Sequence, residues 1–403
     1  MRKWVLLTAA AFIAATASVP AGTAGAAPSS STWTFKPVIS GLNEPRGLAF
    51  DGQGGLYVAQ AGRPGMGTAG VTRTGAVSKY KWDEGALKRA WSTSFTSVYS
   101  PAEGGGGGSE VLGPAGVSAT GYGCTTMNDD ASANRAARSD RGGSCRVSAI
   151  LSLSHREIEA KTGMEVPQIG HLYRLNARTG AAKSVSNVGD QNYAWTAAHA
   201  NLFTDFPDSN PYAVLNVLDR DGDSTRTFVA DAAANTISAI SRGGKTRVIA
   251  YIPNETSGAK RDATPTCITQ GPDGALYVGA LDLASNFGAG SGQSNVWRVN
   301  PNSTNWRHNA TLWATGFTTI NGCTFDRHGN CWASELFYPN AAGPPGDVAM
   351  APFKHPSAIT HLGGGMLPLP GGISQGPDGS MYVSTGSADT ATGSGAVVRI
   401  SRH

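Results

Sequence analysis

The chain has 403 residues, of which 15% are charged and 53 are glycine, and its formal net charge is +4. A typical soluble domain has about 25% charged residues, so this composition favours short strands joined by tight turns over long, salt-bridged helices. The charge is small and forms no basic block, which argues against nucleic-acid binding. This length suits either two average domains or a single repeat domain.

The first 27 residues have the three parts of an export signal. A basic start, MRKW, precedes the apolar run VLLTAAAFIAATASV (residues 5–19) and small residues at 21–27. The apolar run is too short to span a bilayer comfortably, and no comparable run follows. We predict a cleaved signal peptide over residues 1–27, no membrane span and a soluble, secreted, extracellular protein. A retained membrane anchor is the alternative. Loss of Arg2 and Lys3 would leave a charge of +2.

The stretch GLNEPRGLAFDGQGGLYVAQ (41–60) contains two apolar runs around a Gly-rich turn, and both runs recur. The turn and second run return as GPDGALYVG (271–279) and GPDGSMYVS (376–384), and more loosely at 221–231 and 327–334. The first run is a proline, any residue, a small residue and usually an aliphatic residue. Its copies begin at Pro45, Pro114, Pro211, Pro265 and Pro370, with a sixth at Ile320 that lacks the proline.

These six copies, mostly about 50 to 70 residues apart, predict an all-β, six-bladed β-propeller over residues 31–403. The small residue lets the innermost strands of neighbouring blades approach at the central channel. The longer gap between Pro114 and Pro211 requires insertions, and we place flexible loops at about residues 100–145. The last strand-like stretch (395–401) has no fourth strand after it, so we expect residues 31–40 to complete the last blade and close the ring. A β-sandwich with two ordinary terminal strands is the alternative.

Five cysteines in an exported chain predict two disulfides and one free thiol. The repeat alignment places Cys323 and Cys331 at facing positions of one hairpin, close enough for a bridge. Cys124 and Cys145 bracket a polar insertion, whose base a second bridge would hold. Cys267 is then expected to be a free, small, buried residue.

Propellers bind ligands at the mouth of the channel, and the residues flanking each innermost strand are the candidates there. Glu44, Asn210 and Asn321 would supply three oxygen ligands for a divalent cation such as calcium or magnesium. The alternative is that they cap turns and strand ends. We expect further mouth-lining side chains at Arg46, Tyr212, Thr266, Asp231 and Glu335. For the last two, hydrogen bonds to neighbouring backbone amides are the alternative.

Three other segments are less specific. Residues 219–223 (DRDGD) have alternate oxygens like half of a calcium loop, but lack its later glutamate and fall where a hairpin turn is expected. The glycine run at 104–109 is interpreted as a flexible loop, since no lysine or helix follows it. The segment 151–171 contains His155, Glu157 and Glu159 and is interpreted as a solvated surface loop suited to specificity.

The runs DSNPYAV (208–214), GLNEPRGLAF (41–50) and LWATGFTTI (312–320), with the repeated GPDGALYV, resemble the secreted ScyD/ScyE family over residues 33–403. More distantly, the chain resembles six-bladed NHL, gluconolactonase and streptogramin-lyase propellers. The first resemblance implies a secreted propeller without an assigned activity. The second implies metal-dependent hydrolysis or elimination at the channel mouth, with Glu44, Asn210 and Asn321 as the positions that carry ligands over. The chain departs from such relatives at Ala115, where they often have a histidine, and at Gln60 and Ala280, where they have acidic residues.

Our first hypothesis is a secreted, monomeric propeller that binds a small molecule or a cell-surface component without catalysis. The alternative is a metal-dependent lactonase, hydrolase or lyase. A third is a purely structural envelope or matrix protein. These hypotheses differ in whether the purified protein holds a divalent metal that depends on Glu44, and in whether it associates with the cell surface.

Overall fold

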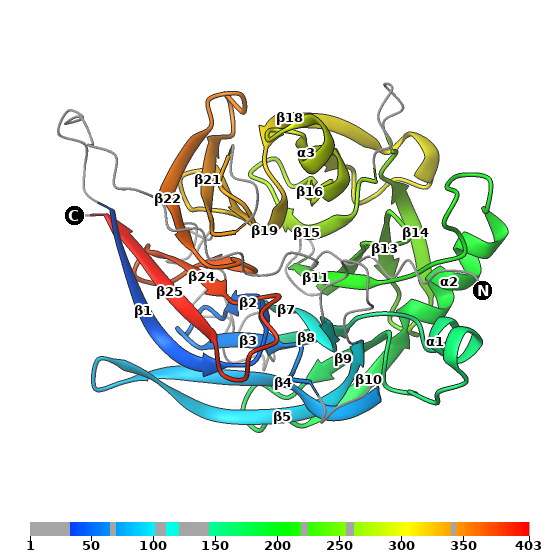
Figure 1. Cartoon of the computed structure of the whole chain (residues 1–403), viewed down its shortest axis with the longest axis horizontal. Coiled ribbons are helices and arrows are strands. Elements are labelled where there is room, and N and C mark those ends of the chain that lie inside the picture. Colours follow the sequence, from blue (N-terminus) through cyan, green and yellow to red (C-terminus); the bar gives the residue numbers. More distant parts are fainter. Residues whose placement is uncertain are drawn as a thin grey trace.

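Six antiparallel sheets surround a central axis (Figure 1). The computed structural model describes residues 33–64, 70–100, 110–120, 145–218, 225–254, 262–339 and 344–402. The predicted signal peptide, Cys124, the glycine run and residues 219–223 lie outside the described residues. The six-bladed propeller predicted from the repeat is confirmed.

The first three blades run in chain order from the axis outward. Blade 1 contains β2 (Pro45–Phe50), β3 (Leu56–Gln60), β4 (Gly70–Asp83), β5 (Ala86–Ser100) and β6 (Glu110–Leu112). Blade 2 contains β7 (Pro114–Thr120), β8 (Arg146–Leu151), β9 (His171–Leu175) and β10 (Ala182–Asn187). Blade 3 contains β11 (Pro211–Leu218), β12 (Thr225–Asp231), β13 (Thr236–Ile240) and β14 (Thr246–Tyr251).

The remaining three blades complete the ring. Blade 4 contains β15 (Pro265–Gln270), β16 (Leu276–Ala280), β17 (Ser294–Val299) and β18 (Ala310–Phe317). Blade 5 contains β19 (Ile320–Phe325), β20 (Asn330–Glu335), β21 (Gly346–Pro352) and β22 (Thr360–Leu367). Blade 6 contains β23 (Ile373–Gln375), β24 (Met381–Thr385), β25 (Gly395–Arg402) and β1 (Trp33–Leu42). Five inner strands begin at the predicted residue, and β23 begins three residues after Pro370.

The ring is closed by the strand nearest the N-terminus. β1 pairs with β25 from Trp33, opposite Arg402, to Leu42, opposite Gly395, and Figure 1 shows the two strands side by side at the edge of the molecule. This pairing covers what would otherwise be an open edge of blade 6. It is the closure predicted from the sequence, and it rules out the sandwich alternative.

Small residues bring the inner strands together at the axis. A Cβ atom built on Gly47 would lie 2.8 Å from the carbonyl oxygen of Ala115, and one on Gly116 would lie 2.8 Å from that of Tyr212. A Cβ atom built on Gly372 would lie 2.4 Å from the carbonyl oxygen of Arg46. A side chain at any of these positions would force the neighbouring blades apart, which explains the small residue in the repeat.

The Asp-Gly turn of the repeat has a structural role. In blade 4, Tyr277 Oη and Arg298 Nε donate to the same carboxylate oxygen of Asp273, at 3.2 and 2.8 Å. Equivalent residues make the same contacts in two other blades, namely Asp378 with Tyr382 and Arg399, and Asp51 with Tyr57 and Lys79. The turn is thereby tied to the second and third strands of its blade.

Short helical segments lie within blades 2 and 4 and between blades 2 and 3. They are α1 (His155–Thr162), α2 (Val188–Ala198), α3 (Leu283–Ala289) and the 3-10 turn η3 (Trp306–His308). Ser154 caps α1 by accepting from the backbone N–H of Glu157, and Gly163 ends it with φ 73°. Segment 151–171 is therefore partly helical, and Glu157 is buried rather than solvated.

The disulfide prediction for Cys323 is wrong. Cys323 bonds to Cys267, which the sequence suggested to be free, and Cys331 is a buried free thiol. In blade 5, Cys323 lies opposite Ala333, and Cys331 lies opposite Phe325. The hairpin register is thus two residues away from the one assumed, so the two cysteines do not face each other. Cys145 is disulfide-bonded, and its pairing with Cys124 stays a prediction.

Candidate functional site

The channel mouth lies at the N-terminal ends of the inner strands, and Arg46 occupies it. The Arg46 side chain is almost fully buried. Its Nη2 atom donates to Glu44 Oε2 at 3.2 Å, to Glu110 Oε1 at 3.3 Å and to the carbonyl oxygen of Val111 at 2.9 Å. Nε donates to the carbonyl oxygen of Ser387 at 3.3 Å. A fixed guanidinium therefore holds two carboxylates from blade 1.

The two carboxylates share one cation in a largely buried environment. Burial raises the pKa of Glu44 to about 8, against the opposing effect of Arg46. Burial also raises the pKa of Glu110. The guanidinium stays charged at any physiological pH and lies 5.7 Å from the centre of the Tyr212 ring, within cation–π range. Glu110 was not among the residues suggested by the sequence, since it belongs to the short extra strand β6.

The oxygens predicted to bind a metal at the mouth are largely engaged. Asn210 Oδ1 accepts from the backbone N–H of Leu153 at 3.1 Å. Asn321 Oδ1 accepts from Tyr212 Oη at 2.9 Å. Glu44 contacts Arg46, while its Oε1 atom is buried without a hydrogen bond to any described residue. The positive charge beside these side chains is therefore that of the Arg46 guanidinium rather than of a metal ion.

Three of the five predicted lining residues border the mouth cavity and two do not. Arg46, Tyr212 and Thr266 line it. Asp231 instead accepts from the backbone N–H groups of Asn210 and Ala234, at 2.7 and 2.9 Å. Glu335 accepts from the backbone N–H of Thr318 at 2.7 Å. Their carboxylates hold the loops that precede β11 and β19, and Asp231 also holds the turn after β12. Hydrogen bonds to neighbouring backbone amides were the alternative interpretation.

The mouth cavity is small. Its volume is about 40 Å³, whereas pockets for drug-sized ligands have roughly 300–1,000 Å³. This space suits a few water molecules or one small functional group, because a single water needs about 10–15 Å³ by the same measure. A sugar or lactone ring would not fit inside it.

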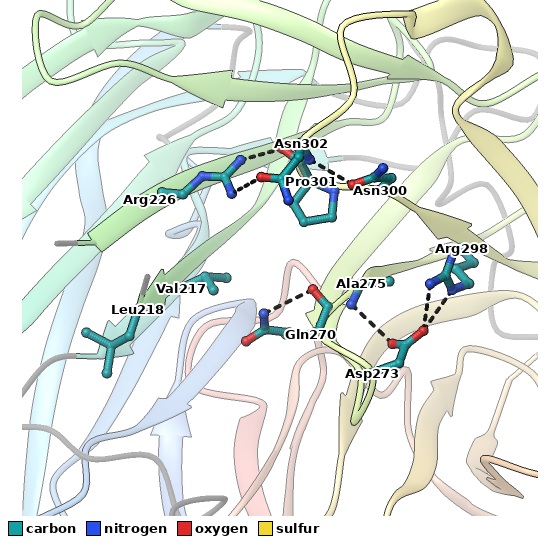
Figure 2. Close-up of a pocket in the computed structure, with 11 residues that line it drawn as sticks. Val217, Leu218, Arg226, Gln270, Asp273, Ala275, Arg298, Asn300, Pro301 and Asn302 are labelled. Atoms are coloured by element: carbon teal, nitrogen blue, oxygen red, sulfur yellow. Dashed lines mark hydrogen bonds and ion pairs between the residues drawn. The ribbon is translucent and has the colours of Figure 1, made fainter. Parts of the chain in front are cut away.

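A larger hollow lies at the opposite ends of the inner strands, between blades 3 and 4. Its volume is about 670 Å³. Figure 2 shows Arg226 with Asn302 on one side and Arg298 with Asp273 on the other. The residues that line it are Val217, Leu218, Arg226, Gln270, Asp273, Gly274, Ala275, Arg298, Asn300, Pro301 and Asn302. The hollow thus combines aliphatic surface with amide, arginine and carboxylate groups.

A third group lies inside blade 5 and could hold a metal ion. Ligand atoms of Glu335, Asp347 and His361 lie within 4.8 Å of one another. His361 Nδ1 is 3.2 Å from Glu335 Oε2 and 3.3 Å from Asp347 Oδ2. Burial raises the pKa of Glu335 to about 8, and contact with Asp347 and Glu335 raises that of His361 to about 10. Sequence reasoning missed Asp347 and His361, because their proximity depends on strand register rather than on a motif.

The described residues contain no helix with the length and apolar character that a membrane crossing requires. The disulfide between Cys267 and Cys323 is typical of extracellular or otherwise oxidising surroundings.

No family model and no curated protein sequence matches the chain. Among solved structures, the chain is similar to a gluconolactonase from Xanthomonas campestris at 10% identity, with 92% of this chain and 89% of that chain covered and a TM-score of 0.50. The PQQ-bound aldose sugar dehydrogenase from Streptomyces coelicolor matches at 12% identity, with 93% and 99% covered and a TM-score of 0.48. A streptogramin B lyase matches at 13% identity, with 92% and 98% covered and a TM-score of 0.44. The likeness to the gluconolactonase shows the propeller fold alone.

Proposed function

We propose that this chain is a secreted, ScyD/ScyE-type propeller that acts as a binding protein, with the hollow between blades 3 and 4 as its ligand site. One comparison carries the proposal. The mouth, with about 40 Å³, is closed around Arg46, while the hollow has about 670 Å³. A whole small molecule therefore has room in the hollow and not in the mouth.

The chemistry of the hollow favours a hydroxyl-rich ligand of one or two sugar rings. Gln270, Asn300 and Asn302 line the hollow with amides. Gln270 Nε2 donates to the carbonyl oxygen of Gly274, and the Oδ1 atoms of Asn300 and Asn302 accept from Asn302 N–H and Arg226. The other amide atoms, Gln270 Oε1 and the two asparagine Nδ2 groups, supply an acceptor and donors for a ligand. Both arginines are already engaged, Arg298 with Asp273 and Arg226 with Pro301 and Asn302. These partners reduce the attraction for a free anion. Hydroxyl groups both donate and accept, so they match such a mixed rim.

The metal-dependent lactonase or lyase receives less support. Such a reaction at the mouth needs a divalent cation held by oxygens, and both carboxylates there already pair with Arg46. A guanidinium, unlike a metal ion, cannot coordinate a substrate oxygen or activate a bound water. We therefore favour binding over metal-assisted catalysis at the mouth.

Titration with glucose, maltose and cellobiose tests the proposal, with binding followed by calorimetry and by saturation-transfer NMR. We expect at least one sugar to bind and Arg298→Gln to weaken it about tenfold. Arg399→Gln is the matched control, because Arg399 makes the same contact with Asp378 in blade 6. Both substitutions remove a partly exposed ion pair worth less than about 1 kcal/mol, so the fold should persist. Absence of binding by all three sugars, or equal weakening in both variants, would overturn the assignment.

A further inference from the structure

We propose that blade 5 contains a structural site for one divalent transition-metal ion, with Zn²⁺ as the type, bound by Glu335, Asp347 and His361. This site is separate from the channel mouth and from the hollow. It does not depend on the proposed binding function.

The three side chains come from three consecutive strands of one sheet. Glu335 ends β20 and lies directly opposite Asp347 of β21. His361 of β22 lies opposite Ala349, two residues along the strand from Asp347. Side chains two residues apart point to the same face, so the histidine reaches the acidic pair from the next strand. The pairing of β20, β21 and β22 therefore brings the three side chains together.

Two directly opposed carboxylates repel each other, and here both side chains are fully buried. Asp347 Oδ1 and Oδ2 and Glu335 Oε2 have no hydrogen-bond partner within the described part of the chain. His361 Nδ1 lies within ion-pair distance of both residues but forms no hydrogen bond to either. Glu335 Oε2 and Asp347 Oδ2 thus lie beside one imidazole nitrogen without a hydrogen bond. Buried carboxylate oxygens without hydrogen-bond partners are rare in proteins, which favours a ligand at this position.

A divalent ion matches the charge of the two carboxylates. Two ionised carboxylates, a neutral histidine and a divalent cation carry no net charge, so the occupied site would be neutral inside the blade. The ion would also give the unpaired oxygens a partner and join β20, β21 and β22.

The donor set and its spacing favour zinc over calcium or magnesium. Imidazole nitrogen suits Zn²⁺ and related ions, whereas calcium and magnesium prefer oxygen donors alone. Zinc bonds of about 2.0–2.1 Å in a tetrahedron place the donor atoms about 3.3 Å apart. The observed separations from His361 Nδ1 are 3.2 and 3.3 Å. His361 is partly exposed, with 27% of its side chain accessible, which gives the ion a path from solvent and leaves room for a water ligand.

The test uses the full-length secreted protein, stripped with a chelator and titrated with Zn²⁺ by calorimetry. Co²⁺ is added in a parallel experiment, since its visible absorption reports tetrahedral coordination. We expect one ion per chain and an affinity at least tenfold lower in His361→Gln and Asp347→Asn. His361→Gln is the safer variant, because its side chain is partly exposed.

The matched control is His155→Gln. His155 has a similar acidic setting on the surface, with Nε2 3.7 Å from Glu159 and 3.5 Å from Glu165. This variant and Glu44→Gln should both retain the full affinity. Absence of stoichiometric Zn²⁺ binding would overturn the proposal. So would unchanged affinity in His361→Gln, or an equal loss in His155→Gln.

Discussion

The sulfur atoms of Cys267 and Cys323 are bonded across the boundary between blades 4 and 5, with their Cα atoms 5.6 Å apart. Cys267 takes the small position of its inner strand, where other blades have residues such as Gly47 and Gly116. At those glycines, the inner strands approach so closely that larger side chains are excluded. Between blades 4 and 5, the same close approach brings the two sulfur atoms together. The disulfide therefore links two blades rather than two strands of one hairpin.

Removal of this bridge should destabilise the protein strongly. The two cysteines are separated by 56 residues, and closing a loop of that length stabilises the folded state by about 4 kcal/mol in the chain-entropy description. We expect Cys267→Ala with Cys323→Ala to lower the free energy of unfolding by about that amount in denaturant titrations. Cys331→Ala is the control and should cost about 1 kcal/mol, since it removes one buried sulfur. Equal losses in the two proteins would contradict the pairing.

Arg46→Met should show that the guanidinium substitutes for a metal at the channel mouth. The variant leaves Glu44 and Glu110 buried without their shared cation, and breaking such a contact from one side costs about 3–5 kcal/mol. We expect a lower melting temperature at pH 8 that added Ca²⁺ partly restores, whereas Ca²⁺ leaves the wild type unchanged. Adding Glu44→Gln and Glu110→Gln should restore stability and remove the Ca²⁺ response. A Ca²⁺ response in the wild type would revive the metal site predicted from the sequence.

Glu44 should make stability fall as pH rises. Its pKa is raised to about 8 in the folded protein from an ordinary value of 4.5, so the folded state binds more protons than the unfolded chain between these values. The stabilising contribution is complete below about pH 4.5 and is lost as pH rises to about 8. We expect the wild type to lose up to a few kcal/mol relative to Glu44→Gln across that range. Parallel pH profiles for the two proteins would show that Glu44 keeps an ordinary pKa.

The propeller could be predicted from the sequence because each residue type in its repeat is required by the local backbone conformation. Proline at a strand start, a small residue at the axis and an Asp-Gly turn each have a backbone reason to recur. The turn aspartates, such as Asp273, proved to bind the tyrosine and the cation of their own blade. Closure by β1 followed from counting strands in the last blade.

The sites could not be predicted equally well, because they depend on which side chains meet across strands and blades. A two-residue error in one hairpin register changed the partner of Cys323. Asp347 and His361 have no spacing that marks a ligand pair, since only the pairing of β21 with β22 brings them together. Arg46 was identified as a lining residue, but its role as the central cation required Glu110, from a strand outside the four-strand pattern. Long-range register, rather than local propensity, decides these contacts.

The closing strand should be replaceable by a peptide. Removing residues 1–43 would strip β25 of its partner and remove the buried side chains of Ile39 and Leu42, as well as Trp33, which packs edge-on against Trp332 at 5.7 Å. Burial of two such aliphatic side chains alone stabilises by about 3–6 kcal/mol, comparable to the whole stability of many domains. We expect the truncated chain to aggregate through the open edge of β25.

A synthetic peptide of residues 31–43 should restore a monomer with cooperative unfolding, by adding its strand to that edge. Light scattering and thermal unfolding would show this, with a scrambled peptide as the control. A truncated chain that stays monomeric with an unchanged melting temperature would mean that β1 contributes little to closing the ring.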